Sequence, residues 1–259
     1  MKGDWMNAIL IFLYVYMFVI GCCVASFINV VIYRVPLGIS VAKGRSFCPA
    51  CHHQLHAIDL IPILSYVTLG GKCRYCHSHI PMRDTLLELL GGLLAMLCFY
   101  RFGFDWMSLL SFVFIMVLQA ISFIDLDTME IPNGLVICCL IIALISVPIM
   151  DLSIIDRLIG FLALSVPLYL LNYVIPDSFG GGDIKLLATC GLLLGWKNLL
   201  VGMFIAVILA GGYACYLLAS GKIEKSGHIA FGPYICIGMF ISLLYGTQLL
   251  NAYLGLFGL

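Results

Sequence analysis

Long apolar runs are the feature of this 259-residue sequence that most constrains its fold. Seven runs are long enough to cross about 30 Å of hydrocarbon, near residues 8–33, 85–100, 106–124, 134–150, 158–175, 199–219 and 230–254. An eighth run, residues 186–195, is too short for a secure span and indicates a short tilted or re-entrant helix. With 63% apolar residues, the chain does not have the composition of a soluble globular domain. We predict an all-α, polytopic membrane helix bundle of about eight transmembrane spans.

The first run is predicted to be a retained span over residues 1–33, although residues 19–22 resemble a lipoprotein cleavage box. Lys2 and Asp4 leave the segment before it without net charge, and the run continues to Tyr33.

The distribution of charge, rather than its sum, carries information in this chain. Lys plus Arg and Asp plus Glu both number 13, so no net field draws the chain to nucleic acid. With eight spans and the N-terminus outside, nine basic residues face the cytoplasm and four lie outside, a bias typical of membrane proteins. The nine are Arg34, Lys43, Arg45, Lys72, Arg74, Arg83, Lys185, Lys222 and Lys225. This topology puts residues 34–84, Asp125 and Asp183 on the cytoplasmic side. They lie on the same side in the alternative topology, in which residues 186–195 form a re-entrant segment.

The only sizeable polar stretch, residues 34–84, contains two Cys-x-x-Cys pairs. Cys48 and Cys51 form the first pair, Cys73 and Cys76 form the second, and 21 residues separate the two pairs. Two such pairs supply four thiolates to a tetrahedral zinc ion, and ligation supplies folding free energy to a loop with little apolar content. We predict a cytoplasmic zinc-binding domain over residues 34–84, followed by a membrane core over residues 85–259.

Redox-active or unligated thiols are the alternative to a zinc site, since a cytoplasmic location argues against disulfides. Four cysteines already complete the coordination, so the histidines of the loop are interpreted as ordinary polar residues. They are His52, His53, His56, His77 and His79. The other eight cysteines lie in apolar segments and are assigned no chemistry.

Carboxylates at the cytoplasmic ends of apolar runs are the second informative feature, because an ionisable group is costly in hydrocarbon. Asp125 and Asp127 lie where one long run closes, and Pro132 suits the first turn of the next helix. Side chains two residues apart on a helix point about 200° apart, so these two carboxylates cannot share one face. Their spacing alone does not decide which of them points inward.

Three consecutive glycines, at positions 180–182, bring Asp183 to the start of an apolar segment. Glycines permit irregular backbone and close approach of another segment, and in a membrane such backbone persists where protein or a water-filled cavity surrounds it. The alternative interpretation is that Asp183 only N-caps the helix that follows.

Two carboxylates on one membrane face can hydrolyse a peptide bond with a water molecule between them. The ionised carboxylate removes a proton from the water while the protonated one polarises the scissile carbonyl. The sequence has no His-Glu-x-x-His motif, no Gly-x-Ser-x-Gly motif and no histidine within an apolar run to serve as the base for a serine. An aspartic dyad is therefore the peptidase chemistry that the residues favour.

Together these motifs resemble those of the bacterial type IV prepilin leader peptidases that are also N-methyltransferases. The resemblance begins at residues 26–36, Ser-Phe-Ile-Asn-Val-Val-Ile-Tyr-Arg-Val-Pro, and includes both cysteine pairs with residues 59–66 and 71–74. It continues through residues 125–133 to the Gly-x-Gly-Asp motif of Gly180, Gly182 and Asp183, with Lys185 beside it.

The resemblance implies that Asp125 and Asp183 are the catalytic pair, which decides between Asp125 and Asp127, and that the four loop cysteines hold zinc. It implies type IV prepilin or pseudopilin substrates with a Gly before the cut, in the bacterial inner membrane. It also implies methylation of the new N-terminus by S-adenosylmethionine. No Rossmann-type glycine loop locates the donor. Glu88, which could serve the transfer, is interpreted as a helix-dipole partner at the start of the second span.

Two other classes of protein share parts of this pattern. An ion-coupled membrane transporter would use Asp125 and Asp183 as a relay and the zinc loop as a regulator, but such carboxylates usually lie near mid-bilayer between repeated halves. Here both lie at one interface, and the apolar runs show no internal repeat. A non-enzymatic assembly factor with a zinc recognition loop is the other class. Cleavage of a prepilin-like peptide at its Gly distinguishes a peptidase from both.

Overall fold

The computed structural model describes residues 2–176, 178–221 and 229–258. Within these residues the chain forms helices joined by loops, and the extended pairings are two isolated bridges, Phe47 with Gln54 and Lys72 with His79. Two lysines that contribute to the charge bias, Lys222 and Lys225, lie outside the described residues, as do the side chains of Lys2 and Asp4.

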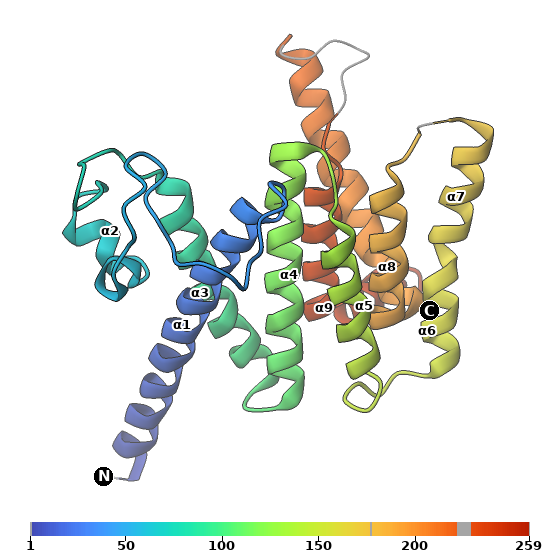
Figure 1. Cartoon of the computed structure of the whole chain (residues 1–259). Helices are drawn as coiled ribbons and strands as arrows, with labels where there is room; N and C mark the ends of the chain where they lie inside the picture. Colours follow the sequence, from blue (N-terminus) through green and yellow to red (C-terminus); the bar gives the residue numbers. More distant parts are fainter. Residues whose placement is uncertain (1, 177, 222–228, 259) are drawn as a thin grey trace. The chain divides into compact units, whose positions relative to one another are not determined.

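The chain divides into two compact units, and the division falls within one helix (Figure 1). The first unit, Met1–Phe112, contains α1 (Lys2–Arg34), η1 (Ala57–Leu60), α2 (Leu64–Thr68), α3 (Met82–Phe102) and the start of α4 (Trp106–Thr128). The second unit, Val113–Leu259, contains the rest of α4, α5 (Asn133–Ile145), α6 (Ile154–Ala163), α7 (Ser165–Val174), α8 (Gly181–Ala219) and α9 (Gly232–Gly255).

Six helical stretches of the described chain are long and apolar enough to cross a membrane, which confirms the predicted all-α, polytopic architecture. They are Trp5–Arg34, Met82–Phe102, Trp106–Thr128, Ile154–Val174, Gly181–Ala219 and Gly232–Gly255. The sequence predicted about eight spans, and two features of the structure account for the smaller number. The run at 134–150 forms only the short helix α5, since Pro148 disfavours helix at the residue before it. The runs at 186–195 and 199–219 both belong to α8.

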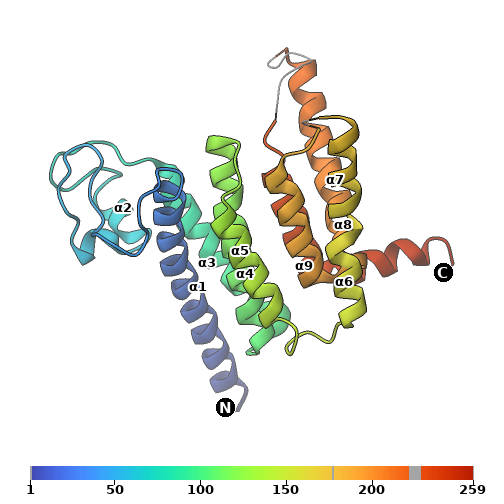
Figure 2. The ribbon, with the colours of Figure 1, turned by 45° about the vertical axis from the view of Figure 1, so that its right-hand side comes forward.

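α8 is interrupted at Gly195, whose φ of 73° and ψ of 167° lie outside the helical region. Its second part packs against α9 in the antiparallel direction (Figure 2), because Gly238 lies against Gly202 while Ser242, further along α9, lies against Asn198, earlier in α8. The absence of side chains at Gly202 and Gly238 lets the two helices approach closely, a common basis of helix association in membranes.

Both α9 and the first part of α8 begin beside the same carboxylate. Gly232, at the start of α9, donates to Asp125, and Asp183, at the start of α8, interacts electrostatically with Asp125. The chain therefore reverses its direction at Gly195, and the two parts of α8 are antiparallel. Residues 181–194 rise only about 20 Å, less than the hydrocarbon thickness of about 30 Å.

Arg157 is a buried cation that joins two helix ends in the second unit. Only 2% of its surface is exposed, and its guanidinium donates to the Ser146 hydroxyl at 2.7 Å and to the Ser146 carbonyl at 3.1 Å. It also donates to the Leu192 carbonyl at 3.1 Å. Ser146 caps the end of α5 and Leu192 lies just before Gly195, so Arg157 satisfies carbonyl groups that these helix ends leave without partners.

Close packing of α1 against α3 organises the first unit. A side chain at Gly21 or Gly91 would collide with the other helix, so these glycines permit the contact. At the end of α1, Asn29 donates to the carbonyl of Asp84 in the first turn of α3 at 2.9 Å. The loop of residues 35–81 thus leaves α1 and enters α3 at neighbouring points.

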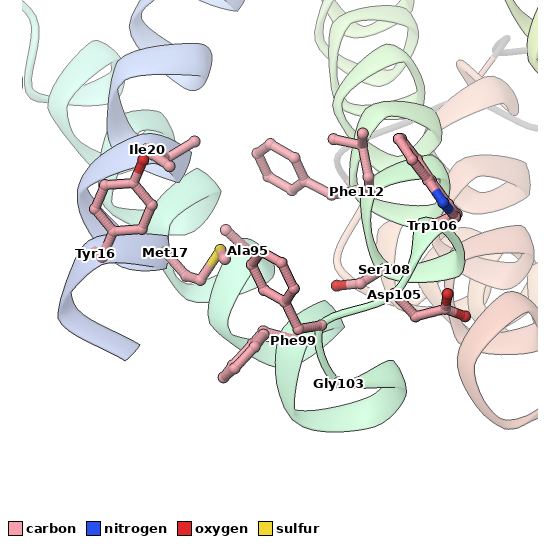
Figure 3. Close-up of a pocket in the computed structure, with 12 residues that line it drawn as sticks. Tyr16, Met17, Ile20, Ala95, Phe99, Gly103, Asp105, Trp106, Ser108 and Phe112 are labelled. Atoms are coloured by element: carbon pink, nitrogen blue, oxygen red, sulfur yellow. The ribbon is translucent and has the colours of Figure 1, made fainter. Parts of the chain in front are cut away.

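The first unit also contains a cavity of about 500 Å³. It lies between the middle of α1, the end of α3 and the start of α4, and its walls include Tyr16, Ile20, Phe99, Trp106 and Phe112 (Figure 3). None of the predicted site residues lines it.

Candidate functional site

The two cysteine pairs have the same local backbone. The His52 N–H donates to the Cys48 carbonyl at 2.8 Å, and the His77 N–H donates to the Cys73 carbonyl at 3.0 Å. His52 and His77 both have positive φ, 57° and 56°, a conformation that histidine adopts more often than most residues. Each pair therefore forms a tight knuckle in which the chain turns back directly after the second cysteine.

The four cysteine thiols gather at one point. All four Sγ atoms lie within 4.8 Å of one another, and Cys48 Sγ and Cys76 Sγ, from different knuckles, are 3.9 Å apart. A tetrahedral zinc ion with Zn–S bonds of about 2.3 Å needs sulfur atoms about 3.8 Å apart. The cluster of Cys48, Cys51, Cys73 and Cys76 therefore fits a zinc ion. The loop histidines are exposed and stand outside the cluster, which agrees with their interpretation as ordinary polar residues.

Ser78 lies beside the thiols and was not identified from the sequence. Its Oγ is 3.1 Å from Cys76 Sγ and 3.7 Å from Cys48 Sγ, and its hydrogen bond lowers the pKa of Cys76. Burial of the Cys48 thiol opposes ionisation, but the N–H groups of Cys51 and Ala50, together with the side chains of Ser78 and Cys73, lower the pKa of Cys48 to about 6. Since the thiolate is the form that binds metal, these donors favour ligation.

Asp59, in η1, links this short helix to the second cysteine knuckle, residues 73–77, through hydrogen bonds. Its side chain is only 4% exposed. Arg74 Nε donates to Asp59 Oδ1 at 2.6 Å, and the Tyr75 hydroxyl donates to Oδ2 at 3.1 Å. The His56 N–H, just before η1, donates to Oδ2 at 3.2 Å. The Arg74 guanidinium is the main cause that holds the pKa of Asp59 below its ordinary value.

Glu88 holds the loop against α3 and is not the helix-dipole partner that we expected. That interpretation is wrong because α3 begins at Met82, so Glu88 lies beyond the first turn, where the dipole effect has faded. Its carboxylate accepts the N–H of Ile63 at 2.9 Å. Ile63 has φ 63° and ψ −50°, a strained backbone for a β-branched residue. The hydrogen bond to Glu88 therefore stabilises an unfavourable conformation.

Asp125 and Asp127 differ in burial, which the sequence could not decide. Asp125 is 5% exposed, whereas Asp127 is exposed. α4 ends at Thr128, one residue before Met129 with φ 55°, so Asp125 lies in the last turn of the helix and faces the interior of its unit. Pro132 is the N-cap of α5, one position before the predicted first turn.

Asp183 lies in the first turn of α8, near Asp125. The N-cap of α8 is Gly180, with no side-chain capping bond, so Asp183 is not the N-cap. Its carboxylate interacts electrostatically with that of Asp125. A Cβ atom at Gly182 would lie 2.8 Å from Ile131 Cβ, so the missing side chain lets the start of α8 approach the segment that follows α4.

Lys185 connects α8 to α5. Its Nζ donates to Asn133 Oδ1 at 3.0 Å, and Asn133 is the first residue of α5. The contact joins the N-terminal parts of two helices, and Lys185 lies two residues after Asp183.

Gly232 is a site residue that sequence reasoning missed. Its N–H donates to Asp125 Oδ2 at 3.0 Å, and a Cβ atom at Gly232 would lie 2.6 Å from the same oxygen. The available signal was the Gly-Pro dipeptide at the start of an apolar run, since Pro233 occupies the first turn of α9. That signal predicts a helix start, but it does not indicate a partner 107 residues away.

Comparisons with known proteins agree over most of the chain. The model of the bacterial peptidase A24 N-terminal domain matches residues 19–102, and that of the type IV leader peptidase family matches residues 112–215. The prepilin leader peptidase/N-methyltransferase of Stutzerimonas stutzeri is 32% identical, over 91% of this chain and 92% of that protein. Proteins of the same name from Aeromonas salmonicida and Bacillus subtilis are 30% and 31% identical, over 96% and 92% of this chain and 94% and 96% of theirs. No solved structure matches.

The helical spans and these relatives define a multi-pass enzyme of the bacterial inner membrane. The chain belongs to the type IV leader peptidase family. The family predicted from the motifs is confirmed, and the enzyme interpretation is supported over the transporter and the assembly factor.

Proposed function

We propose that the chain cleaves the leader peptides of type IV prepilins and pseudopilins, with Asp125 and Asp183 as the catalytic pair. The observation that carries this proposal is the electrostatic interaction between two carboxylates from separate helices. One of them, Asp125, is buried and held by the Gly232 N–H, which fixes its orientation. Pre-set orientation of this kind is what an acid–base pair requires.

In the proposed reaction, a water molecule lies between one ionised and one protonated carboxyl group. The ionised group takes a proton from the water while the water oxygen attacks the scissile carbonyl carbon, and the protonated group gives its proton to the carbonyl oxygen. When the C–N bond breaks, the leaving amine takes a proton from the pair, and one water molecule has been consumed. Because the two groups exchange roles, they titrate as a unit.

Gly180, Gly182 and Lys185 support this pair in the proposal. Gly182 allows the close approach of α8 to Ile131, and Lys185 fixes α8 to α5 through Asn133. Gly180, the N-cap of α8, is exposed and has no side chain, so a substrate peptide can approach Asp183 past it.

The remaining parts of the chain have proposed roles outside the cut. Residues 1–33 form the first span, residues 34–84 form a zinc-binding domain, and residues 85–259 form the peptidase core. Zinc held by the four cysteines would stabilise the domain, as structural zinc does in small loops with few apolar residues. A cytoplasmic location for this domain is supported by its six basic residues, Arg34, Lys43, Arg45, Lys72, Arg74 and Arg83. The next two spans, α3 and α4, return the chain to the same side at Asp125, which interacts with Asp183.

N-methylation of the new N-terminus is the second proposed activity, and the names of the relatives support it. S-adenosylmethionine would supply the methyl group from its sulfonium. The neutral amine would form a bond to the methyl carbon while the carbon–sulfur bond breaks and a thioether leaves, and the methylated ammonium would then lose a proton. This chemistry needs no carboxylate pair, so its residues differ from Asp125 and Asp183.

Membranes that contain the chain, mixed with a prepilin-like peptide carrying Gly before the cut, test both activities by mass spectrometry. We expect loss of the leader and, with S-adenosylmethionine, one added methyl group at the new N-terminus. An ion-coupled transporter would leave the peptide intact. The Asp183→Ala variant should still methylate a peptide supplied without its leader, and loss of methylation there would mean that the two activities share one site.

A further inference from the structure

Asn172 of α7 holds the main chain just ahead of the Gly-x-Gly-Asp motif. Its Nδ2 donates to the Phe179 carbonyl at 2.7 Å, and its Oδ1 accepts the Phe179 N–H at 2.8 Å. The Ser178 hydroxyl donates to the same Oδ1 at 2.8 Å. One amide therefore satisfies both the donor and the acceptor of a single residue, as a neighbouring β-strand would.

The contact restrains the backbone directly before the three glycines of the motif. Residues 180–182 are all glycine, so the N-cap and the first two residues of α8 lack the conformational preference that a side chain would give them. Asp183 can keep a fixed position only if both ends of this segment are held. The helix α8 holds the far end, and the two hydrogen bonds of Asn172 hold the near end.

The side chain of Phe179 extends the restraint to the second carboxylate. Its ring meets the Phe231 ring edge-on, with centroids 6.1 Å apart and an interplanar angle of 65°. Phe231 is the N-cap of α9 and directly precedes Gly232, whose N–H donates to Asp125. A continuous series of contacts therefore links Asn172 to both carboxylates, and every member lies in the second unit.

We propose that Asn172 is a positioning residue that sets the separation of Asp125 and Asp183, an inference that rests on the proposed peptidase function. It touches neither the substrate nor the reacting atoms. Its effect passes through Phe179 to the start of α8 and through Phe231 to the start of α9.

The test compares Asn172→Leu, which has similar volume but no hydrogen bonds, with Asn172→Gln, which keeps both groups on a longer side chain. Ser178→Ala is the matched control, because it removes a hydrogen bond to Asn172 and leaves the Phe179 contacts in place. We expect cleavage to fall about 10- to 100-fold in Asn172→Leu, as for misplacements of about 1 Å. Asn172→Gln should recover part of this loss, and Ser178→Ala should cleave within threefold of wild type.

The pH profile separates positioning from a general loss of folded protein. Two interacting carboxyl groups give a bell-shaped profile whose width grows with their mutual repulsion. If Asn172→Leu lets the carboxylates move apart, the bell narrows, whereas a smaller folded fraction lowers activity equally at every pH. The substitution leaves unchanged the thiol of Cys236, which interacts electrostatically with both carboxylates, and the thiol of Cys139 beside it. It also leaves unchanged Asp127 and Lys185, which lie two residues along the chain from Asp125 and Asp183.

Amide hydrogen exchange at residues 178–184 tests the restraint without any cleavage assay. Faster exchange there in Asn172→Leu, but not in Ser178→Ala, supports the proposal even if the substrate has been misidentified. Unchanged exchange in Asn172→Leu overturns it. A uniform fall in cleavage with unchanged profile width, or cleavage within threefold of wild type, also overturns it. Failure of the wild type to cleave any prepilin-like peptide would instead refute the proposed function.

Discussion

Substitution of Gly232 by Ala should disable cleavage while the fold persists. The new Cβ atom would lie 2.6 Å from Asp125 Oδ2 and 3.0 Å from Asp125 Cγ. Ordinary van der Waals contact begins near 3.4 Å, so the carboxylate must retreat by about 0.8 Å, and the hydrogen bond from the Gly232 N–H is lost or weakened. Hydrogen bonds to charged groups contribute about 1.5–3 kcal/mol, and misplacement of a reacting group by about 1 Å costs about 100-fold in rate. We expect cleavage about 100-fold slower than in wild type.

Gly211→Ala is the matched control for this experiment. Gly211 lies in α8, and an added Cβ atom there meets nothing within 4 Å. Alanine is favoured over glycine in a helix by roughly 0.5–1 kcal/mol, so this variant should be as stable as wild type and equally active. Both variants are assayed for cleavage of a prepilin-like peptide and for thermal unfolding in detergent. Cleavage by Gly232→Ala within threefold of Gly211→Ala would refute the role assigned to the Gly232 contact.

Three further outcomes are expected elsewhere in the chain. Elemental analysis of the purified protein should find one zinc ion per chain that is lost in Cys48→Ser or Cys76→Ser, and a folded wild type without metal would contradict the zinc site. Asp59→Asn should release zinc about fivefold faster at pH 7, since a net hydrogen bond contributes about 1 kcal/mol. The pKa of Asp59 is lowered by folding, so its stabilisation is complete above about pH 4 and is lost at lower pH. Unfolding midpoints of wild type and Asp59→Asn should therefore converge below that pH, and a constant difference would exclude the carboxylate as the cause. Arg157→Met should lower the stability by roughly 3 kcal/mol, because it leaves buried carbonyl groups without donors, and an unchanged unfolding temperature would exclude that role.

The cluster of four cysteines could be predicted because the sequence pattern that forms it is local. Each Cys-x-x-Cys pair forms a turn within a few residues, and only the meeting of the two turns depends on distant sequence. The helical class was equally accessible, since apolar runs of this length have few other folds. The number of spans was harder, because apolar runs alone do not show that the run at 134–150 forms only a short helix, or that the runs on either side of the break at Gly195 belong to one interrupted helix.

The carboxylate site could be predicted only in part. The periodicity of a helix shows that Asp125 and Asp127 point apart, but their burial depends on which helices pack against α4. The sequence around Gly232 and Asn172 does not indicate the contacts that these residues make. The first appears as an ordinary helix start and the second as a polar residue in an apolar helix, because both contacts form only when distant segments meet.

Cleavage by three single variants, Asp125→Asn, Asp183→Asn and Asp127→Asn, tests the central claim most directly. Each removes one ionisable group with almost no change in size, so folding should be preserved. We expect no detectable cleavage of a prepilin-like peptide by Asp125→Asn or Asp183→Asn, since each leaves the pair without one acid–base partner, and nearly normal cleavage by Asp127→Asn. Full activity of a folded Asp125→Asn or Asp183→Asn variant, or loss of activity in Asp127→Asn alone, would contradict the account.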